Sequence, residues 1–127
     1  MSSFDDKQAI SENVTRYAYA VDFGEFGAFR SVLADDARAA FMMEALGREN
    51  ITVDGADAII ERMSSRGPAP MLPRHAMVNH LVAIDGDRAI SRTYLANGSA
   101  LYYCDHVRTA QGWRIQRLEV RMFADPS

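Results

Sequence analysis

Asp22 and His75 are the residues whose type and position best suit acid–base chemistry. Asp22 ends a periodic stretch over residues 7–22. The apolar side chains of that stretch recur at helical spacing and are Ile10, Val14, Tyr17 and Val21. At about 100° per residue, Asp22 falls on the border of this stripe, so the helix would deliver a carboxylate to the edge of the core. An exposed Asp22 with no function is the alternative, although a negative charge at a helix C-terminus is unfavourable by ~0.3–1 kcal/mol.

His75 opens a predicted strand over residues 74–84, directly after a proline-rich segment. A side chain at that strand end can face the mouth of a cavity. Strand alternation would place His75, Met77 and Asn79 on one face and His80 on the other. A structural role is the alternative for both polar residues: His75 as a hydrogen-bonded strand histidine, and Asn79 as an amide that satisfies buried backbone.

Other kinds of site have little support in the sequence. His75, His80 and His106 lack the helical spacing of a metal site, so no metal is expected. The glycines are too scattered for a phosphate-binding loop, and no serine-nucleophile motif is present. A carboxylate, an imidazole and phenols remain, and that set is suited to proton transfer without a cofactor. Whether His80 or His106 takes the place of His75 stays open.

The composition is that of an ordinary globular protein and excludes several partners. The chain has 127 residues, of which 48% are hydrophobic and 24% charged, so we expect a single domain over 1–127. A net charge of −3 argues against nucleic acid as a partner. No apolar run approaches the ~18 residues of a membrane span, and no secretory signal is evident. Cys104 is the only cysteine, which favours a reducing cytoplasm.

The sequence predicts helices first and a sheet afterwards. The expected elements of the first half are a helix over 6–22, an amphipathic segment from Phe26 to about 35–36, a strand over 37–43, a strand over 51–53, a helix over 56–63 and a loop over 66–73. The second half is predicted as four strands, over 74–84, 87–96, 99–109 and 113–123. They are separated by the turn signals Asp85-Gly86, Asn97-Gly98 and Gln111-Gly112. This order predicts an α+β domain in which helices cover one face of a bent sheet around a pocket.

Several short motifs, in their order and spacing, resemble one known family. The motifs are Arg16-Tyr17-x4-Asp22, His75-x3-Asn79, Asp85-Gly86-Asp87-x-Ala89 and Tyr103-x-Asp105-x2-Arg108-x3-Gly112-Trp113-Arg114. Over residues 5–123 the chain is similar to the SnoaL-like branch of the NTF2-like superfamily. The resemblance implies a cone-shaped α+β barrel, the cystatin-like fold. Three N-terminal helices would pack on a strongly curved, mixed, mainly antiparallel sheet.

The resemblance also implies an activity and a site. Enzymes of this branch include scytalone dehydratase, bile-acid 7α-dehydratase, hexachlorocyclohexane dehydrochlorinase and polyketide cyclases. Several of them pair an Asp at the end of the first helix with a His at the start of the long strand, roles that match Asp22 and His75. Tyr17 matches a helix tyrosine of the bile-acid enzyme. We therefore expect a cofactor-independent lyase or isomerase that acts on a small hydrophobic, cyclic substrate, with catalytic residues Asp22, His75 and Tyr17.

Four residues are predicted to contact the substrate: Met77, Asn79, Tyr103 and Asp105. The last strand alternates so that each face mixes polar and apolar side chains, which favours an oligomer interface. The resemblance implies a homodimer or homotrimer through the sheet. Two other functions stay open: a non-catalytic domain that binds a hydrophobic molecule or a protein partner, and an accessory subunit of a larger enzyme.

Overall fold

The computed structural model describes residues 3–65 and 75–123, which form helices packed on one sheet. The helices are α1 (Ser3–Phe23), α2 (Phe26–Arg30) and α3 (Ala56–Ser64), with a 3₁₀ turn η1 (Glu44–Leu46). The strands are β1 (Leu33–Met42), β2 (Ile51–Asp54), β3 (Met77–Asp85), β4 (Arg88–Leu95), β5 (Ala100–Thr109) and β6 (Gly112–Met122). The predicted loop over 66–73 lies outside the described residues.

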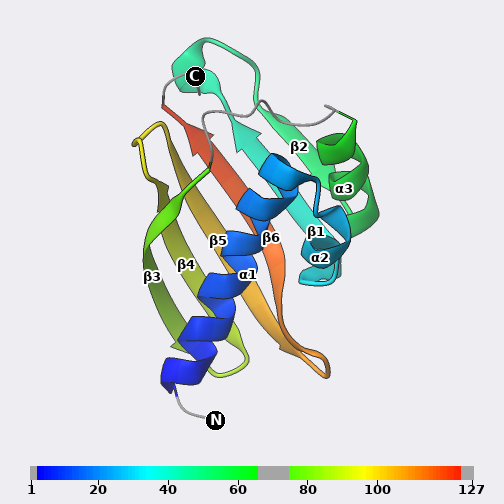
Figure 1. Cartoon of the computed structure of the whole chain (residues 1–127), viewed down its shortest axis with the longest axis vertical. Coiled ribbons are helices and arrows are strands. Elements are labelled where there is room, and N and C mark those ends of the chain that lie inside the picture. The colour runs from blue at the N-terminus through cyan, green and yellow to red at the C-terminus, as the bar shows by residue number, and fades with distance from the viewer. Residues whose placement is uncertain (1–2, 66–74, 124–127) are drawn as a thin grey trace.

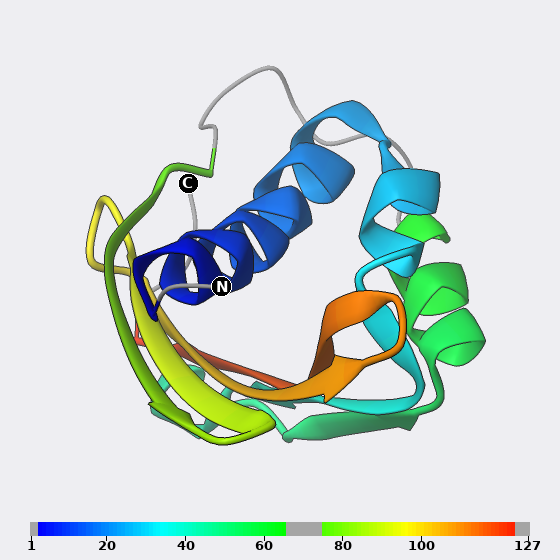
Figure 2. The ribbon, with the colours of Figure 1, turned by 90° about the horizontal axis from the view of Figure 1, so that it is seen from below.

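The six strands form one mixed sheet in the order β2-β1-β6-β5-β4-β3. β1 runs parallel to β6, and every other neighbouring pair is antiparallel. The three predicted hairpins are confirmed, with Gly86, Gly98 and Gly112 at positive φ. The sheet curves around α1, which crosses its concave inner face, while α2 and α3 lie towards the β1 side (Figures 1 and 2). The α+β prediction is therefore confirmed, although the curved sheet does not close into a barrel.

The apolar stripe of α1 explains why the helix lies where it does. Val14 and Tyr17 join the main core with Phe29 of α2, and all three side chains are buried. Ile10, one turn earlier, forms a smaller cluster with Ala89 and Trp113 at the other end of the sheet. Each large apolar side chain buried in this way contributes about 1.5–3 kcal/mol of transfer free energy. The stripe thus fixes which face of α1 meets the sheet, and with it the direction of Asp22.

A buried carboxylate anchors the N-terminal end of α1. Asp6 accepts hydrogen bonds from both terminal nitrogens of Arg108, at 3.3 and 3.1 Å, and from Trp113 Nε1 at 3.1 Å. The Arg108 guanidinium also lies 4.5 Å from the centre of the Trp113 ring. The hydrogen bonds from Arg108, followed by that from Trp113, lower the pKa of Asp6. Helix α1 is therefore tied to β5 and β6 at its beginning.

The predicted amphipathic segment after α1 is wrong in its second half. The helix ends at Arg30, and Leu33 already belongs to β1. The Ser31 hydroxyl bonds the Ala28 carbonyl, and the Val32 carbonyl accepts the amide of Ile115 in β6 at 2.7 Å. Pairing with β6 therefore competes successfully with the helical spacing that runs from Phe29 to Leu33.

Two strands break the alternation that the sequence analysis assumed. In β3 the pairing with β4 shifts between Val78 and Leu81, and in β6 the pairing with β5 shifts at Gln116. Each shift is a bulge, which inserts one residue and reverses the facing of every side chain beyond it. The faces of β6 are therefore not mixed. Its inner side chains are Trp113, Ile115, Leu118 and Val120, and its outer ones beyond the bulge are Arg117, Glu119 and Arg121.

Candidate functional site

Asp22 lies in the last turn of α1 with its side chain only 3% exposed. Gly24 follows at positive φ and donates its amide to the Ala20 carbonyl at 2.8 Å, which ends the helix. The unsatisfied carbonyls at a helix C-terminus repel a carboxylate, and burial adds a desolvation cost. Asp22 therefore needs hydrogen-bond donors from outside its own helix.

His75 supplies two of those donors. Its ring Nδ1 lies 2.6 Å from Asp22 Oδ1, and its backbone amide donates to Asp22 Oδ2 at 2.7 Å. An ionised carboxylate can only accept, so we assign the proton of the neutral ring to Nδ1. That assignment leaves Nε2 unprotonated. The His75 side chain is 22% exposed, so the dyad sits at the edge of the core.

Aromatic rings surround the dyad on the inner side of the sheet. The Tyr17 ring meets the His75 ring edge-on, with centroids 6.3 Å apart. Tyr17 also packs against Phe29 and Tyr102, at centroid distances of 5.7 and 5.3 Å. Burial raises the pKa of the Tyr102 phenol, with smaller contributions from nearby groups that include Tyr17 and Asp22. Tyr102 therefore remains a neutral phenol at physiological pH.

Of the four residues predicted to contact substrate, one lies on the inner side of the sheet and the other three do not. Met77 is partly buried against the main core, on the inner side of the sheet. Asn79 is exposed and lies at the β3 bulge with φ 58°, so the predicted shared face with His75 and Met77 is wrong. Tyr103 and Asp105 do share a face of β5, but it is the outer one, because Tyr102 and Cys104, which alternate with them, are buried on the side that faces α1. The predicted reach of Tyr103 and Asp105 into the cavity is therefore wrong as well.

Sequence reasoning missed Tyr102, because alternation along β5 does not by itself select the inner set. One set carries Asp105 and the other carries His106 and Arg108, so charge does not distinguish them. In the structure the inner set includes Tyr102, Cys104 and His106, and pairing with the neighbouring strands decides this.

The inner face of β3 to β5 carries a row of polar side chains beneath α1. His80 Nδ1 lies 2.8 Å from Thr93 Oγ1, and His106 Nε2 lies 2.8 Å from Ser91 Oγ. Burial lowers the pKa of His106 to about 4, and it raises the pKa of the Cys104 thiol to about 12. His106 Nδ1 has no hydrogen-bond partner within the part of the chain that the structure describes.

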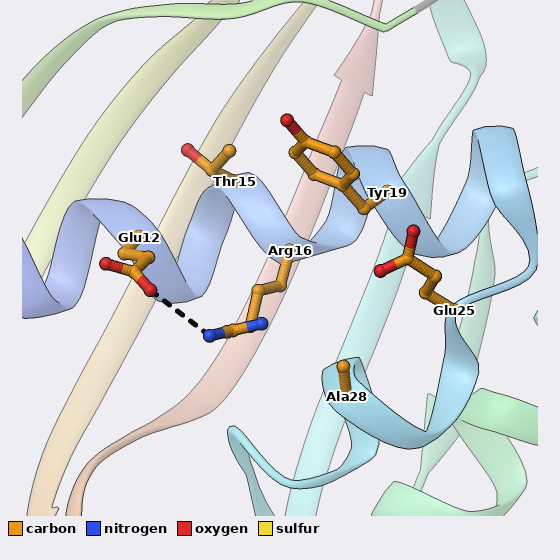
Figure 3. A pocket seen from close by; sticks show the side chains of 6 residues that line it. All are labelled: Glu12, Thr15, Arg16, Tyr19, Glu25 and Ala28. Carbon is orange, nitrogen blue, oxygen red and sulfur yellow. Dashed lines mark hydrogen bonds and ion pairs between the residues drawn. The ribbon is translucent and has the colours of Figure 1, made fainter.

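A surface groove of about 330 Å³ lies between α1 and α2 (Figure 3). Its lining residues are Glu12, Thr15, Arg16, Tyr19, Glu25 and Ala28, so it includes no member of the dyad. An exposed ion pair of 3.1 Å joins Arg16 to Glu12 there. Among residues 3–65 and 75–123, no three His, Cys, Asp or Glu side chains gather as a metal site. None of the described helices is long and apolar enough to span a membrane.

The curved sheet with its helices defines the NTF2-like, cystatin-like class of fold. The sequence matches the SnoaL-like domain over residues 2–119, so the chain belongs to the SnoaL-like family. No curated protein matches it.

Several solved structures share the fold. The Kfla4162 protein from Kribbella flavida is 25% identical, with a TM-score of 0.75 over 97% of this chain and 94% of that one. An NTF2-like protein from Novosphingobium aromaticivorans is 22% identical, with a TM-score of 0.71 over 98% of this chain and 85% of that one. A candidate scytalone dehydratase from the same organism is 16% identical, with a TM-score of 0.74 over 94% and 86%.

The buried His106 predicts how stability depends on pH. Its pKa is about 4 in the folded chain against an ordinary 6.5, so the unfolded chain binds more protons between these values. The contribution of the neutral His106 to the free energy of unfolding is therefore complete above pH 6.5 and is lost as the pH falls towards 4. We expect this residue alone to remove about 2 kcal/mol of the free energy of unfolding between about pH 7 and pH 4.5.

Urea unfolding of the wild type and of His106→Leu at both pH values measures this contribution. The difference in unfolding free energy between the two proteins should shift by that amount, which isolates His106 from other groups such as His80 and the carboxylates. An identical loss of stability in the two proteins would contradict a neutral, buried imidazole at this position.

Proposed function

We propose that the protein is a cofactor-independent lyase or isomerase that acts on a small, hydrophobic, cyclic substrate by acid–base catalysis. The observation that carries this proposal is the Asp22–His75 pair, in which His75 Nδ1 lies 2.6 Å from Asp22 Oδ1. Membership of the SnoaL-like family supports the same reading, as does the fold shared with a candidate scytalone dehydratase.

The proposed reaction begins with proton removal by His75 Nε2. The proton leaves a carbon next to a carbonyl or next to a leaving group, and the ring becomes an imidazolium. Asp22 holds the ring orientation and stabilises that positive charge through the Nδ1 hydrogen bond. A positioned proton-transfer group of this kind contributes typically ~10²–10⁴-fold in rate.

Tyr17 is the proposed partner of the dyad. A neutral phenol can donate a hydrogen bond to the oxygen that gains charge, or it can protonate a leaving hydroxyl. Tyr17 is buried, and its orientation is fixed by the edge-on contact with the His75 ring and by packing against Tyr102. With Phe29 and Met77 nearby in the same core, the surroundings are suited to an apolar ring.

Hydrogen–deuterium exchange tests the chemistry without knowledge of the substrate. The probe is 1-tetralone, a neutral bicyclic ketone. In D₂O we expect the wild-type protein to catalyse exchange of the hydrogens on the carbon next to its carbonyl, and NMR measures the rate of this exchange. Asp22→Asn and His75→Ala should each lower the rate at least about 100-fold while the chain stays folded. Asp85→Asn removes an exposed carboxylate of the same charge and should leave the rate unchanged.

Two results would count against this proposal. Wild-type exchange no faster than in buffer, despite binding of the ketone, would favour the non-catalytic binding domain. Full exchange in either dyad variant would remove that residue from the mechanism.

We also propose that the outer face of the sheet joins two or three copies of the chain. Leu81, Ile90 and Tyr94 are exposed on this face by 62%, 60% and 47%. They lie on β3 and β4 close to exposed charges of both signs, Arg92 and Asp105. A surface with exposed apolar side chains and both charges can pair with a second copy of itself.

Sedimentation measures this assembly. The wild type should have two or three times the 14.1 kDa mass of the chain, and Leu81→Glu should be monomeric because it places a charge in the interface. Phe4→Glu is the matched control, since Phe4 is exposed on α1, which lies on the inner face of the sheet, opposite the proposed interface (Figure 2). A monomeric wild type, or an unchanged mass for Leu81→Glu, would contradict the proposed interface.

A further inference from the structure

The backbone of β3 contains a bulge that the dyad does not explain. Val78 pairs with Tyr94, and Leu81 pairs with Arg92. The two residues between Val78 and Leu81 in β3 are therefore opposite a single residue of β4. Asn79 sits inside the bulge with φ 58°, and within the described residues no other non-glycine has a positive φ. Asn is one of the few residues that tolerate this conformation. Bulges of this kind often re-aim a side chain next to a functional site.

The side chain re-aimed here is that of His80. Strict alternation from Met77 would turn His80 outward with Val78. Because of the bulge it turns inward instead, and its Nδ1 lies 2.8 Å from the hydroxyl of Thr93, which is completely buried. The bulge also turns Val82 inward to pack near Ile10, so it serves the core as well.

His80 and His75 lie at the two ends of one series of direct neighbours. Thr93, which binds His80, is paired with Tyr102 across β4 and β5. The Tyr102 ring packs on Tyr17, and the Tyr17 ring on His75. Both imidazoles therefore lie on the inner side of the sheet, connected through Thr93, Tyr102 and Tyr17.

The ring of His80 has one nitrogen that makes no hydrogen bond to the described residues. In the described part of the chain its hydrogen-bond partner is Thr93, at Nδ1, and none is recorded at Nε2. The threonine hydroxyl can donate or accept, so Nε2 can act as either acceptor or donor. His80 is only partly buried, and this burial lowers its pKa, so the ring is neutral at physiological pH.

We propose that His80 binds a second polar group of the substrate, so that the substrate is an uncharged ring compound with two oxygen functions. One oxygen function lies at the Asp22–His75 dyad and the other at His80 Nε2. The inference rests on the proposed function, because it takes the dyad as the place where the ligand reacts.

Two naphthalene probes test this inference by calorimetry. 2,6-Dihydroxynaphthalene carries two hydroxyl groups on a rigid apolar ring system, and 2-naphthol carries one. The wild type should bind the diol at least about tenfold more tightly, which corresponds to about 1.4 kcal/mol. His80→Leu should remove that preference and leave the affinity for 2-naphthol within about twofold, whereas His75→Ala should weaken both probes.

Two variants serve as controls. Asn79→Gly keeps a residue that accepts positive φ and removes only the exposed amide, so the preference for the diol should persist. His80→Gln keeps a hydrogen-bonding group and should restore part of the preference. If His80→Leu does not fold, the ¹⁵N shift of His80 Nε2 in the wild type replaces it. That shift should change with the diol and not with 2-naphthol.

The outcomes separate the two proposals. Binding of both probes that depends on His75 but shows no preference for the diol would overturn the role of His80 alone. An equal loss of both affinities in His80→Leu would show that His80 only packs, and would overturn it too. Failure of the wild type to bind either probe would overturn both the proposed site and this inference.

Discussion

The structure depends on how the Asp22 carboxylate obtains hydrogen-bond donors at the C-terminus of helix α1, the end that disfavours a negative charge. Asp22 is buried in the last turn of α1, where the helix dipole and desolvation both disfavour a negative charge. Its two oxygens are bound by the ring and the backbone amide of His75, a residue 53 positions later. The interaction joins the end of α1 to the segment that leads into β3, and it sets the orientation of the imidazole.

The rest of the fold holds these two ends in place. The Asp6–Arg108–Trp113 cluster fixes the beginning of α1, and the apolar stripe of the helix fixes its face. The bulges in β3 and β6 then decide which side chains turn inward. One of them leaves the inner face of β6 apolar, and the other brings His80 under the helix. Polar groups are in this way confined to a few positions on an otherwise apolar face.

The sequence was informative wherever local chemistry determines structure. Helical spacing placed Asp22 at the border of the core, and Asp85-Gly86 and Asn97-Gly98 marked hairpins that the structure contains. The partnership with His75 came from the family resemblance, because the two residues are far apart in sequence and no local rule joins them. Its geometry is present, and its catalytic role stays a prediction. Asn79 and Tyr103 were misplaced because bulges and strand phase depend on pairing with other strands.

The protonation state of His75 is the most direct test of this account. Two-bond ¹H–¹⁵N correlation spectra of the folded protein near neutral pH separate a ring protonated at Nδ1 from one protonated at Nε2. The account predicts a neutral His75 protonated at Nδ1 in the wild type, and a loss of that preference in Asp22→Asn. A wild-type ring protonated at Nε2 would contradict it, because the nitrogen proposed to accept the substrate proton would already carry one.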